Sequence, residues 1–234
     1  MRVGRPTKSQ VMAAALLPLI LLVLSVLYVI VILCQGRPFL YRSERMRDVD
    51  TAFQLLKIRT MKPVAGAREM VMGGPQQRRI TAIGHVLRRT RLDELPQIFN
   101  VLRGEIVFIG PRPPLRRHVE HQLEAYGALF QVTSPGITGL STVMLHRREE
   151  RLLSKCRSER ETEEFYLLHC LPRKLRLDLL YVRRRSAWLD AVILWRTILR
   201  LFQWKGPKDQ TCVPPVPMHP VRGHGQERDL SIAA

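Results

Sequence analysis

Arg91-Leu92-Asp93-Glu94-Leu95-Pro96-Gln97 is the segment that decides how the centre of the chain folds. Apolar residues recur along and beyond it with helical spacing, and proline is tolerated in a helix only in the first turn, where amides lack intrahelical partners. A helix with Pro96 in its first turn begins near Leu92. The sequence therefore predicts that Asp93 and Glu94 lie at the positive end of a helix, which stabilises carboxylates as anions.

A purely structural role for the two acids is the simpler alternative. Thr90-Arg91-Leu92-Asp93 matches a capping box, and acids are common in a first helical turn. Downstream, however, Gly110-Pro111-Arg112-Pro113 presents an arginine between two prolines, which restrict the backbone before any anion binds. Adjacent acids followed by a rigid arginine favour chemistry on a phosphorylated substrate. The further candidate phosphate ligands are Lys57, Arg59, Arg45 and Arg88.

Charge narrows the classes of partner. The 234 residues include 38 Lys and Arg against 20 Asp and Glu, which gives a net charge of +18. Such an excess indicates an anionic partner: nucleic acid, an anionic membrane surface or a phosphorylated ligand. No P-loop, no glycine-rich dinucleotide motif and no nucleic-acid-binding motif is present, and the four cysteines form no CxxC pair. A zinc site and a disulfide framework are not indicated.

A long uncharged segment precedes all of these residues. Residues 9–36 carry no charge, and residues 11–33 are almost wholly apolar, a length that could cross a bilayer of about 30 Å as a helix. Basic residues flank both ends, so the positive-inside rule gives no clear orientation. Pro18 removes a backbone donor within the segment and would kink a helix. From these residues alone, a spanning helix and a re-entrant helix remain equal alternatives.

The rest of the chain is predicted to be α+β and mainly helical. Residues 38–41 and 52–59 read as strands of a hairpin whose loop is residues 45–50, and residues 63–77 read as a loop. Residues 187–204 combine an apolar body with three tryptophans, which suits an amphipathic helix at a membrane interface as well as a core helix. Further helices are predicted at residues 80–87, 92–102, 120–130 and 147–169. The predicted parts are a membrane-anchoring segment (1–36), a catalytic domain (37–204) and a disordered tail (205–234).

Ordered blocks of sequence resemble the bacterial sugar transferases that are monotopic phosphoglycosyl transferases. The resemblance runs from the apolar segment to about Thr197. Its blocks, in order, are Leu56-Lys57-Ile58-Arg59-Thr60-Met61, Arg79-Ile80-Thr81 with Gly84 and Leu87-Arg88, Leu92-Asp93-Glu94-Leu95-Pro96-Gln97 with Asn100-Val101-Leu102, Gly110-Pro111-Arg112-Pro113, Pro135-Gly136-Ile137-Thr138-Gly139, Asp178 with Tyr181-Val182, and Leu189-Asp190 with Thr197.

The resemblance implies a reaction and roles for particular residues. A sugar phosphate would pass from a nucleotide diphosphate sugar, expected to be a UDP-sugar, to polyprenyl (undecaprenyl) phosphate, initiating exopolysaccharide or glycoconjugate synthesis. Asp93 would be the nucleophile that forms a covalent phosphosugar intermediate, Glu94 would help to hold Mg²⁺, and Arg112 would bind phosphate. The apolar segment would be re-entrant at Pro18, with the catalytic domain on the cytoplasmic face of the inner membrane; a homodimer is left open.

Departures from the family pattern limit what the resemblance implies. The serine that usually precedes the anchor proline is Leu17, and the usual tryptophan-containing stretch after Gly139 is Leu140-Ser141-Thr142-Val143-Met144-Leu145. Because that stretch would contact the donor, the sequence does not identify the sugar. Two non-enzymatic alternatives are a catalytically silent scaffold for polysaccharide assembly and a membrane-anchored nucleic-acid-binding protein. The intact acids and Arg112 argue against the first, and the lack of a nucleic-acid-binding motif argues against the second.

Overall fold

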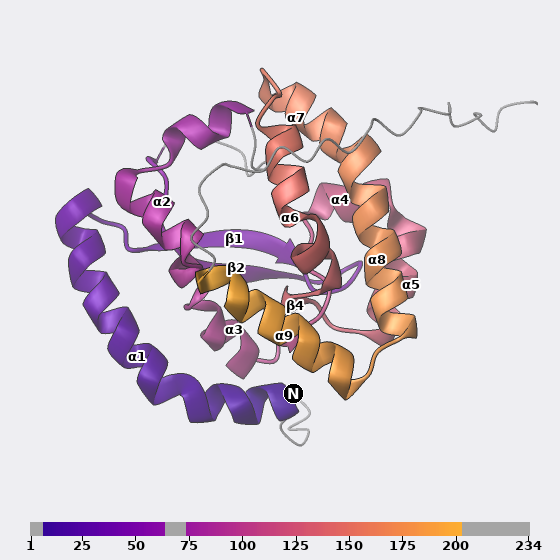
Figure 1. Cartoon of the computed structure of the whole chain (residues 1–234), viewed down its shortest axis with the longest axis horizontal. Coiled ribbons are helices and arrows are strands. Elements are labelled where there is room, and N and C mark those ends of the chain that lie inside the picture. Colours follow the sequence, from indigo (N-terminus) through magenta and orange to yellow (C-terminus); the bar gives the residue numbers. More distant parts are fainter. Residues whose placement is uncertain (1–6, 64–73, 203–234) are drawn as a thin grey trace, which may run out of the picture. The chain divides into compact units, whose positions relative to one another are not determined.

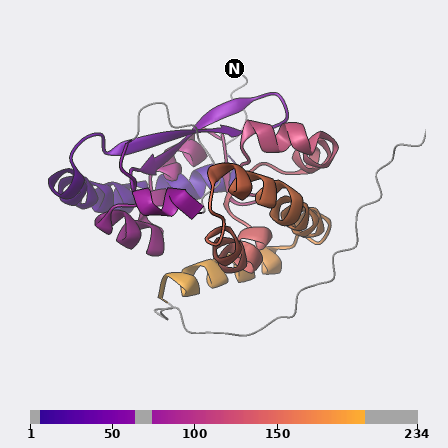
Figure 2. The same cartoon turned by 90° about the horizontal axis from the view of Figure 1, so that it is seen from above.

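Helices surround two small sheets in the computed structural model, which describes residues 7–63 and 74–202 (Figures 1 and 2). These described residues belong to one compact unit. The predicted α+β class, with an apolar N-terminal helix, a short hairpin and a mainly helical remainder, is confirmed. The predicted tail at 205–234 and most of the predicted loop at 63–77 lie outside the described residues.

The apolar segment forms one helix, α1 (Lys8–Gln35). Thr7 and Gln10 cap its start reciprocally, which satisfies amides that have no intrahelical partner. Among the described residues, α1 is the helix long and apolar enough to cross a membrane. Pro18 lies inside it, and Figure 1 shows that the helix changes direction along its length.

The two halves of α1 pack against different parts of the same unit. Ala13, in the first half, lies in an apolar cluster with residues of the hairpin and α3 (Gln97–Leu102). In the second half, Leu24, Leu27 and Val31 pack near α2 (Ala82–Arg89). Both ends are also tied to this unit, because the side chain of Gln10 donates to the carbonyl of Leu102 at 3.1 Å and that of Gln35 donates to the carbonyl of Arg59.

The predicted hairpin is β1 (Leu40–Met46) paired antiparallel with β2 (Ala52–Ile58). β1 begins two residues later and ends five residues later than predicted, so Arg45 belongs to the strand and not to the loop. Fully buried Asn100 fastens α3 to β2: its Oδ1 accepts from the amide of Leu56 at 3.0 Å, and its Nδ2 donates to the carbonyl of Gln54 at 2.8 Å. The segment that carries the two acids is thereby fixed to the hairpin.

A second, parallel sheet was not predicted. It pairs β3 (Val107–Ile109) with β4 (Gly136–Thr138), and each strand has only three residues, too few for a periodic pattern. The predicted helix at 120–130 is interrupted at Gln122, and the predicted helix at 147–169 is interrupted at residues 154–158. The elements in these regions are α4 (Arg116–His121), α5 (Leu123–Val132), α6 (Leu140–Leu153), α7 (Glu159–Phe165) and the π-helical turn η3 (Tyr166–Cys170).

The last two helices close the unit. α8 (Leu171–Arg183) was not predicted, whereas α9 (Ala187–Phe202) matches the predicted amphipathic helix. One side of α9 is docked: Ile193 is buried, and the hydroxyl groups of Thr197 and Thr138 lie 2.9 Å apart. The other side is open, since Trp188 and Trp195 are 78% and 61% exposed. The helix is therefore amphipathic in its packing and not a core helix.

Candidate active site

Asp93 and Glu94 lie in a short 3-10 turn, η2 (Leu92–Glu94), between α2 and α3. The predicted capping box is wrong. The hydroxyl of Thr90 donates back to the carbonyls of Val86 at 2.8 Å and Leu87 at 3.2 Å and so closes α2. Because the helix proper begins only at Gln97, neither acid caps it.

Two guanidinium groups hold Glu94. Arg112 donates from one terminal nitrogen to Glu94 Oε1 at 2.5 Å, and Arg91 donates to Glu94 Oε2 at 3.1 Å. Burial alone would raise the pKa of Glu94, but the charges of Arg112 and Arg91 outweigh burial and hold that pKa well below its usual range. Glu94 is thus a fixed anion, stabilised by arginines and not by a helix terminus.

Asp93 is placed quite differently from Glu94. Its side chain is buried, and its Oδ1 has no hydrogen-bond partner. Burial and the neighbouring charge of Glu94 raise the pKa of Asp93 to about 6, although Lys57 and Arg88 oppose the rise. The expectation that a helix end stabilises this carboxylate is therefore wrong. Asp93 thus has a buried oxygen without a hydrogen-bond partner, and with a pKa of about 6 its carboxyl group is mostly ionised only above that pH.

Cations from two other elements complete the cluster. Lys57 comes from β2, and burial together with the positive charges of Arg112 and Arg45 lowers its pKa to about 7. Arg88 comes from the last turn of α2, where its Nε donates to the hydroxyl of Thr60 at 2.7 Å. With Arg91 and Arg112, these side chains place four cations around two carboxylates. The resulting excess of two positive charges matches the two negative charges of a diphosphate diester.

The small parallel sheet positions Arg112. The amide of Gly110 donates to the carbonyl of Thr138 at 2.8 Å, and the amide of Gly136 donates to the carbonyl of Pro111 at 2.7 Å. A Cβ on Gly136 would lie 2.3 Å from the nitrogen of Gly110, so only glycine permits this crossing. Arg112 also donates to the carbonyl of Ile137 at 3.3 Å. The rigid presentation of Arg112 thus depends on β4 as well as on its flanking prolines.

Arg59 does not join the cluster. Its guanidinium donates to the carbonyls of Gln35 at 2.6 Å, Gly36 at 2.7 Å and Pro38 at 2.8 Å, at the carboxyl-terminal end of α1. Since α1 has no basic residue in its last turn, Arg59 supplies the positive charge that favours that helix end. Arg45 lies on β1 opposite Phe53 and acts on the cluster through its charge near Lys57.

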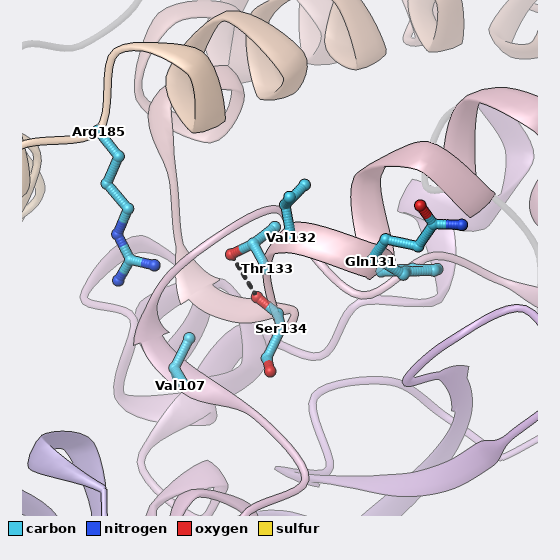
Figure 3. Close-up of a pocket in the computed structure, with 7 residues that line it drawn as sticks. Val107, Gln131, Val132, Thr133, Ser134 and Arg185 are labelled. Atoms are coloured by element: carbon cyan, nitrogen blue, oxygen red, sulfur yellow. Dashed lines mark hydrogen bonds between the residues drawn. The ribbon is translucent and has the colours of Figure 1, made fainter.

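An open cavity of about 320 Å³ lies apart from these residues (Figure 3). Arg185 is the one charged side chain among the seven that line it, and the hydroxyl of Thr133 there donates to the carbonyl of Ser134 at 3.3 Å. No member of the Asp93 cluster lines the cavity, so it is not the candidate phosphate site. Within residues 7–63 and 74–202, no group of three or more His, Cys, Asp or Glu side chains could hold a metal ion.

Two residues that shape the site, Arg91 and Asn100, were not predicted to do so from the sequence. Arg91 was considered only as part of the capping box, although its spacing of three residues from Glu94 is a recognisable signal for an ion pair. Asn100 was noted only as part of a sequence block. Its tie to β2 joins residues that are 44 and 46 positions apart, a relation that no local pattern reveals.

The sequence of this chain matches a known protein family and several characterised relatives. The family model described as bacterial sugar transferase matches residues 5–204. The chain is similar to the UDP-glucose:undecaprenyl-phosphate glucose-1-phosphate transferases of Escherichia coli K12 (31% identity; 82% of this chain and 39% of the relative) and Caulobacter vibrioides (32%; 80% and 66%). It is also similar to the UDP-galactose-lipid carrier transferase of Erwinia amylovora (32%; 80% and 38%).

The match covers the region that holds the cluster, from the apolar helix to α9. The chain nevertheless spans only about a third to two thirds of the length of these relatives. A family match over 200 residues, together with the two acids and the arginine in one cluster, leads to one conclusion: this chain belongs to the bacterial sugar transferase family.

Proposed function

We propose that the protein transfers a sugar phosphate from a nucleotide diphosphate sugar, such as a UDP-sugar, to polyprenyl phosphate. The names of the relatives support this reaction class, because each describes a transfer from a UDP-sugar to undecaprenyl phosphate or to a lipid carrier. One observation carries the proposal. Asp93 has a buried oxygen without a hydrogen-bond partner, within a cluster that has more cations than acids.

The reaction proceeds in two steps. In the first, an oxygen of Asp93 attacks the phosphorus next to the sugar, the bond from that phosphorus to the bridging oxygen breaks, and nucleoside monophosphate leaves with the electron pair. In the second, an oxygen of polyprenyl phosphate attacks the same phosphorus and the carboxylate of Asp93 is released. Lys57, Arg88 and Arg112 hold the phosphate oxygens, so the charge of the donor is neutralised before the attack.

Mg²⁺ fits this cluster as a cofactor. Mg²⁺ commonly takes one or two carboxylates together with waters and substrate phosphates, so a site without a third protein ligand is adequate. Glu94 is ionised at neutral pH, and each of its oxygens has one arginine partner and can accept a second interaction. Glu94 would hold the ion, which would withdraw charge from the diphosphate when bound.

We further propose that α1 is re-entrant and that the domain lies on the cytoplasmic face of the inner membrane. The contacts at both ends of α1 support this, because a helix that crossed the bilayer would carry Gln10 about 30 Å away from Leu102. The exposed tryptophans of α9 suit the same membrane surface. Two variants test this with a membrane-impermeant thiol reagent. The first keeps Cys34 and carries Cys212→Ser; the second carries Lys8→Cys together with Cys34→Ser and Cys212→Ser. The reagent should label position 34 in the first and position 8 in the second from the same side of the membrane. Labelling from opposite sides would contradict re-entry.

The reaction is tested with purified protein in lipid nanodiscs, a panel of UDP-sugars and undecaprenyl phosphate. Mass spectrometry of the lipid product should find one sugar phosphate added, which would be the first sugar placed on the lipid carrier. Without the lipid, the protein should release about one equivalent of nucleoside monophosphate and gain one phosphosugar adduct on the peptide that contains Asp93. Absence of any lipid product would support the scaffold alternative. Release that strictly requires the lipid would exclude Asp93 as the nucleophile.

A further inference from the structure

We propose that Arg91 is a positioning residue, which holds Glu94 so that Arg112 can exchange this carboxylate for a phosphate of the donor. The inference rests on the proposed function for its substrate. It concerns a side chain that is distinct from the nucleophile, the metal-binding acid and the phosphate-binding arginine. Its starting point is that Glu94 has two arginine partners and that each occupies a different carboxylate oxygen.

The backbone at Arg91 sets its side chain apart. Arg91 has φ 57° and ψ 15°, the left-handed conformation, and is the one non-glycine residue with positive φ among the residues described. This conformation is unfavourable for a side chain with a Cβ, and it recurs where a functional geometry requires it. It turns the chain sharply between α2 and η2, where Arg91 reaches Glu94 Oε2.

The two arginines are not equivalent. Arg112 divides its donors between Glu94 and the carbonyl of Ile137, which leaves it in a polar cluster with capacity for another acceptor. Arg91 pairs with the acid in its own turn, three residues away. When a diphosphate arrives, Arg112 can turn towards it while Glu94 keeps the charge of Arg91. Without Arg91, Arg112 would be the sole guanidinium on a buried anion and would be held there.

The contacts of Arg91 are local, so its removal should not unfasten the fold. Its amide donates to the carbonyl of Arg88 at 3.3 Å, and its carbonyl accepts from the amide of Glu94 at 3.1 Å, both of which a glycine retains. Glycine also adopts positive φ without steric cost. Relief of the left-handed conformation offsets part of the lost ion pair, so Arg91→Gly should fold with a Tm within about 5 °C of the wild type, which separates positioning from structural support.

The test measures phosphate binding directly, without turnover or metal. Calorimetry in EDTA and about 0.3 M salt, which screens the general field of the protein, gives the Kd of inorganic pyrophosphate for chains that carry Asp93→Asn. Because the probe is pyrophosphate, the measurement does not depend on the identity of the sugar. The variants are Arg91→Gly, Arg91→Lys, Glu94→Gln, and Arg91→Gly with Glu94→Gln. Arg103→Ala is the matched control, since it removes an exposed arginine at the end of α3.

Arg91→Gly should raise the Kd about tenfold, Arg91→Lys should raise it less, and Arg103→Ala should leave it within about twofold. Glu94→Gln should restore affinity to the Arg91→Gly chain, since it releases Arg112; this rescue distinguishes positioning from direct contact. An equal loss in the Glu94→Gln background would mean that Arg91 touches phosphate itself. A Tm lower by more than about 5 °C, or no change in Kd, would also overturn the proposal. If the variants change the Kd of pyrophosphate as expected but the wild-type protein makes no lipid product, the proposed function is refuted and the role of Arg91 is not.

Discussion

Among the described residues, the cluster of charged side chains around Glu163 and the cluster around Asp93 and Glu94 differ in how completely their hydrogen-bonding groups are paired. In the first, on α4 and α7, Glu163 Oε1 accepts from Arg117 at 2.6 Å and lies 3.0 Å from His118 Nε2, while Oε2 accepts from Arg117 at 3.1 Å. In the second, Asp93 keeps an oxygen without a partner, and cations exceed acids by two. Both clusters join carboxylates to basic side chains, but only the second leaves a carboxylate oxygen unpaired.

On this difference we assign a structural role to the first cluster and propose a reactive role for the second. Burial alone would raise the pKa of Glu163, but hydrogen bonds from His118 and Arg117 outweigh burial and lower it to about 2, so the carboxylate is committed to its partners. Burial and the charge of Glu94 raise the pKa of Asp93 to about 6, so its carboxylate is poorly stabilised. Unsatisfied buried groups are costly, and one that lies within a cluster of cations is a candidate for binding a ligand or for a reaction. Variants at the two clusters should therefore affect different quantities.

The largest expected effect is the loss of transfer in Asp93→Asn. An amide oxygen is a far weaker nucleophile than a carboxylate, so the rate should fall by at least about 10³-fold. The Tm should not fall, because Asp93 neither caps α3 nor makes a hydrogen bond through Oδ1. Lipid-product formation and thermal unfolding in nanodiscs measure the two quantities. Near-normal transfer by this variant would remove Asp93 from the chemistry.

Arg59→Gln tests whether a cation paired within the fold contributes to stability and not to donor binding. Arg59 is satisfied by three carbonyls, so its loss should lower the free energy of unfolding by about 3 kcal/mol, through charged hydrogen bonds at the end of α1. The KM for the donor in the remaining folded protein should change little. A tenfold rise in KM with an unchanged Tm would instead favour the sequence-based prediction that Arg59 binds phosphate.

Glu163→Gln should lower stability by about 2 kcal/mol, because it leaves two basic side chains against a neutral amide. Transfer per folded molecule should stay within about twofold of the wild type. Since the pKa of Glu163 is depressed, the stabilisation that it provides is complete above about pH 4.5 and is lost as the pH falls towards 2. Thermal unfolding of the wild type and the variant between these pH values checks the sign: the difference in stability should grow as the pH rises from about 2 to about 4.5, and a difference that shrinks over this range would contradict it.

The smallest effect is the pH dependence of transfer. Asp93 must be ionised to attack, so kcat/KM should fall as the pH drops through about 6. Lys57 must be protonated to hold phosphate, so kcat/KM should also fall as the pH rises through about 7. The profile should be bell-shaped, with about tenfold loss per pH unit beyond each limb. In Glu94→Gln the residual activity should extend to lower pH, because a neighbouring negative charge is gone; an unshifted acid limb would contradict this cause.

Long, strongly patterned elements were predictable from the sequence, and short ones were not. The apolar run of α1 and the amphipathic run of α9 each give a continuous signal over many residues. The strands β3 and β4 are three residues long and depend on pairing across 29 positions, from Val107 to Gly136. Helix breaks at Gln122 and after Leu153 were missed because neither is marked by proline.

Part of the candidate site was also accessible from the sequence. Asp93, Glu94 and Arg112 were predicted to act together, and the structure brings them into one cluster with Lys57 and Arg88. Arg59 was grouped with them because charge alone does not reveal which anion or carbonyl a guanidinium will meet. The state of the acids was predicted wrongly as well, since local spacing suggests a helix terminus but says nothing of burial.

The sequence by itself determined the apolar N-terminal helix, the positive charge, and an acid pair followed by a constrained arginine, because these properties reside in adjacent residues. Only the tertiary structure decided that Glu94 is held by two arginines while Asp93 keeps a free oxygen. The physical reason is that pKa and hydrogen-bond satisfaction depend on desolvation and on charges within a few ångströms, which come here from β2, α2 and the loop after β3. Asp93 and Glu94 are adjacent in the sequence, yet the side chains around each of them in the fold shift their pKa values in opposite directions.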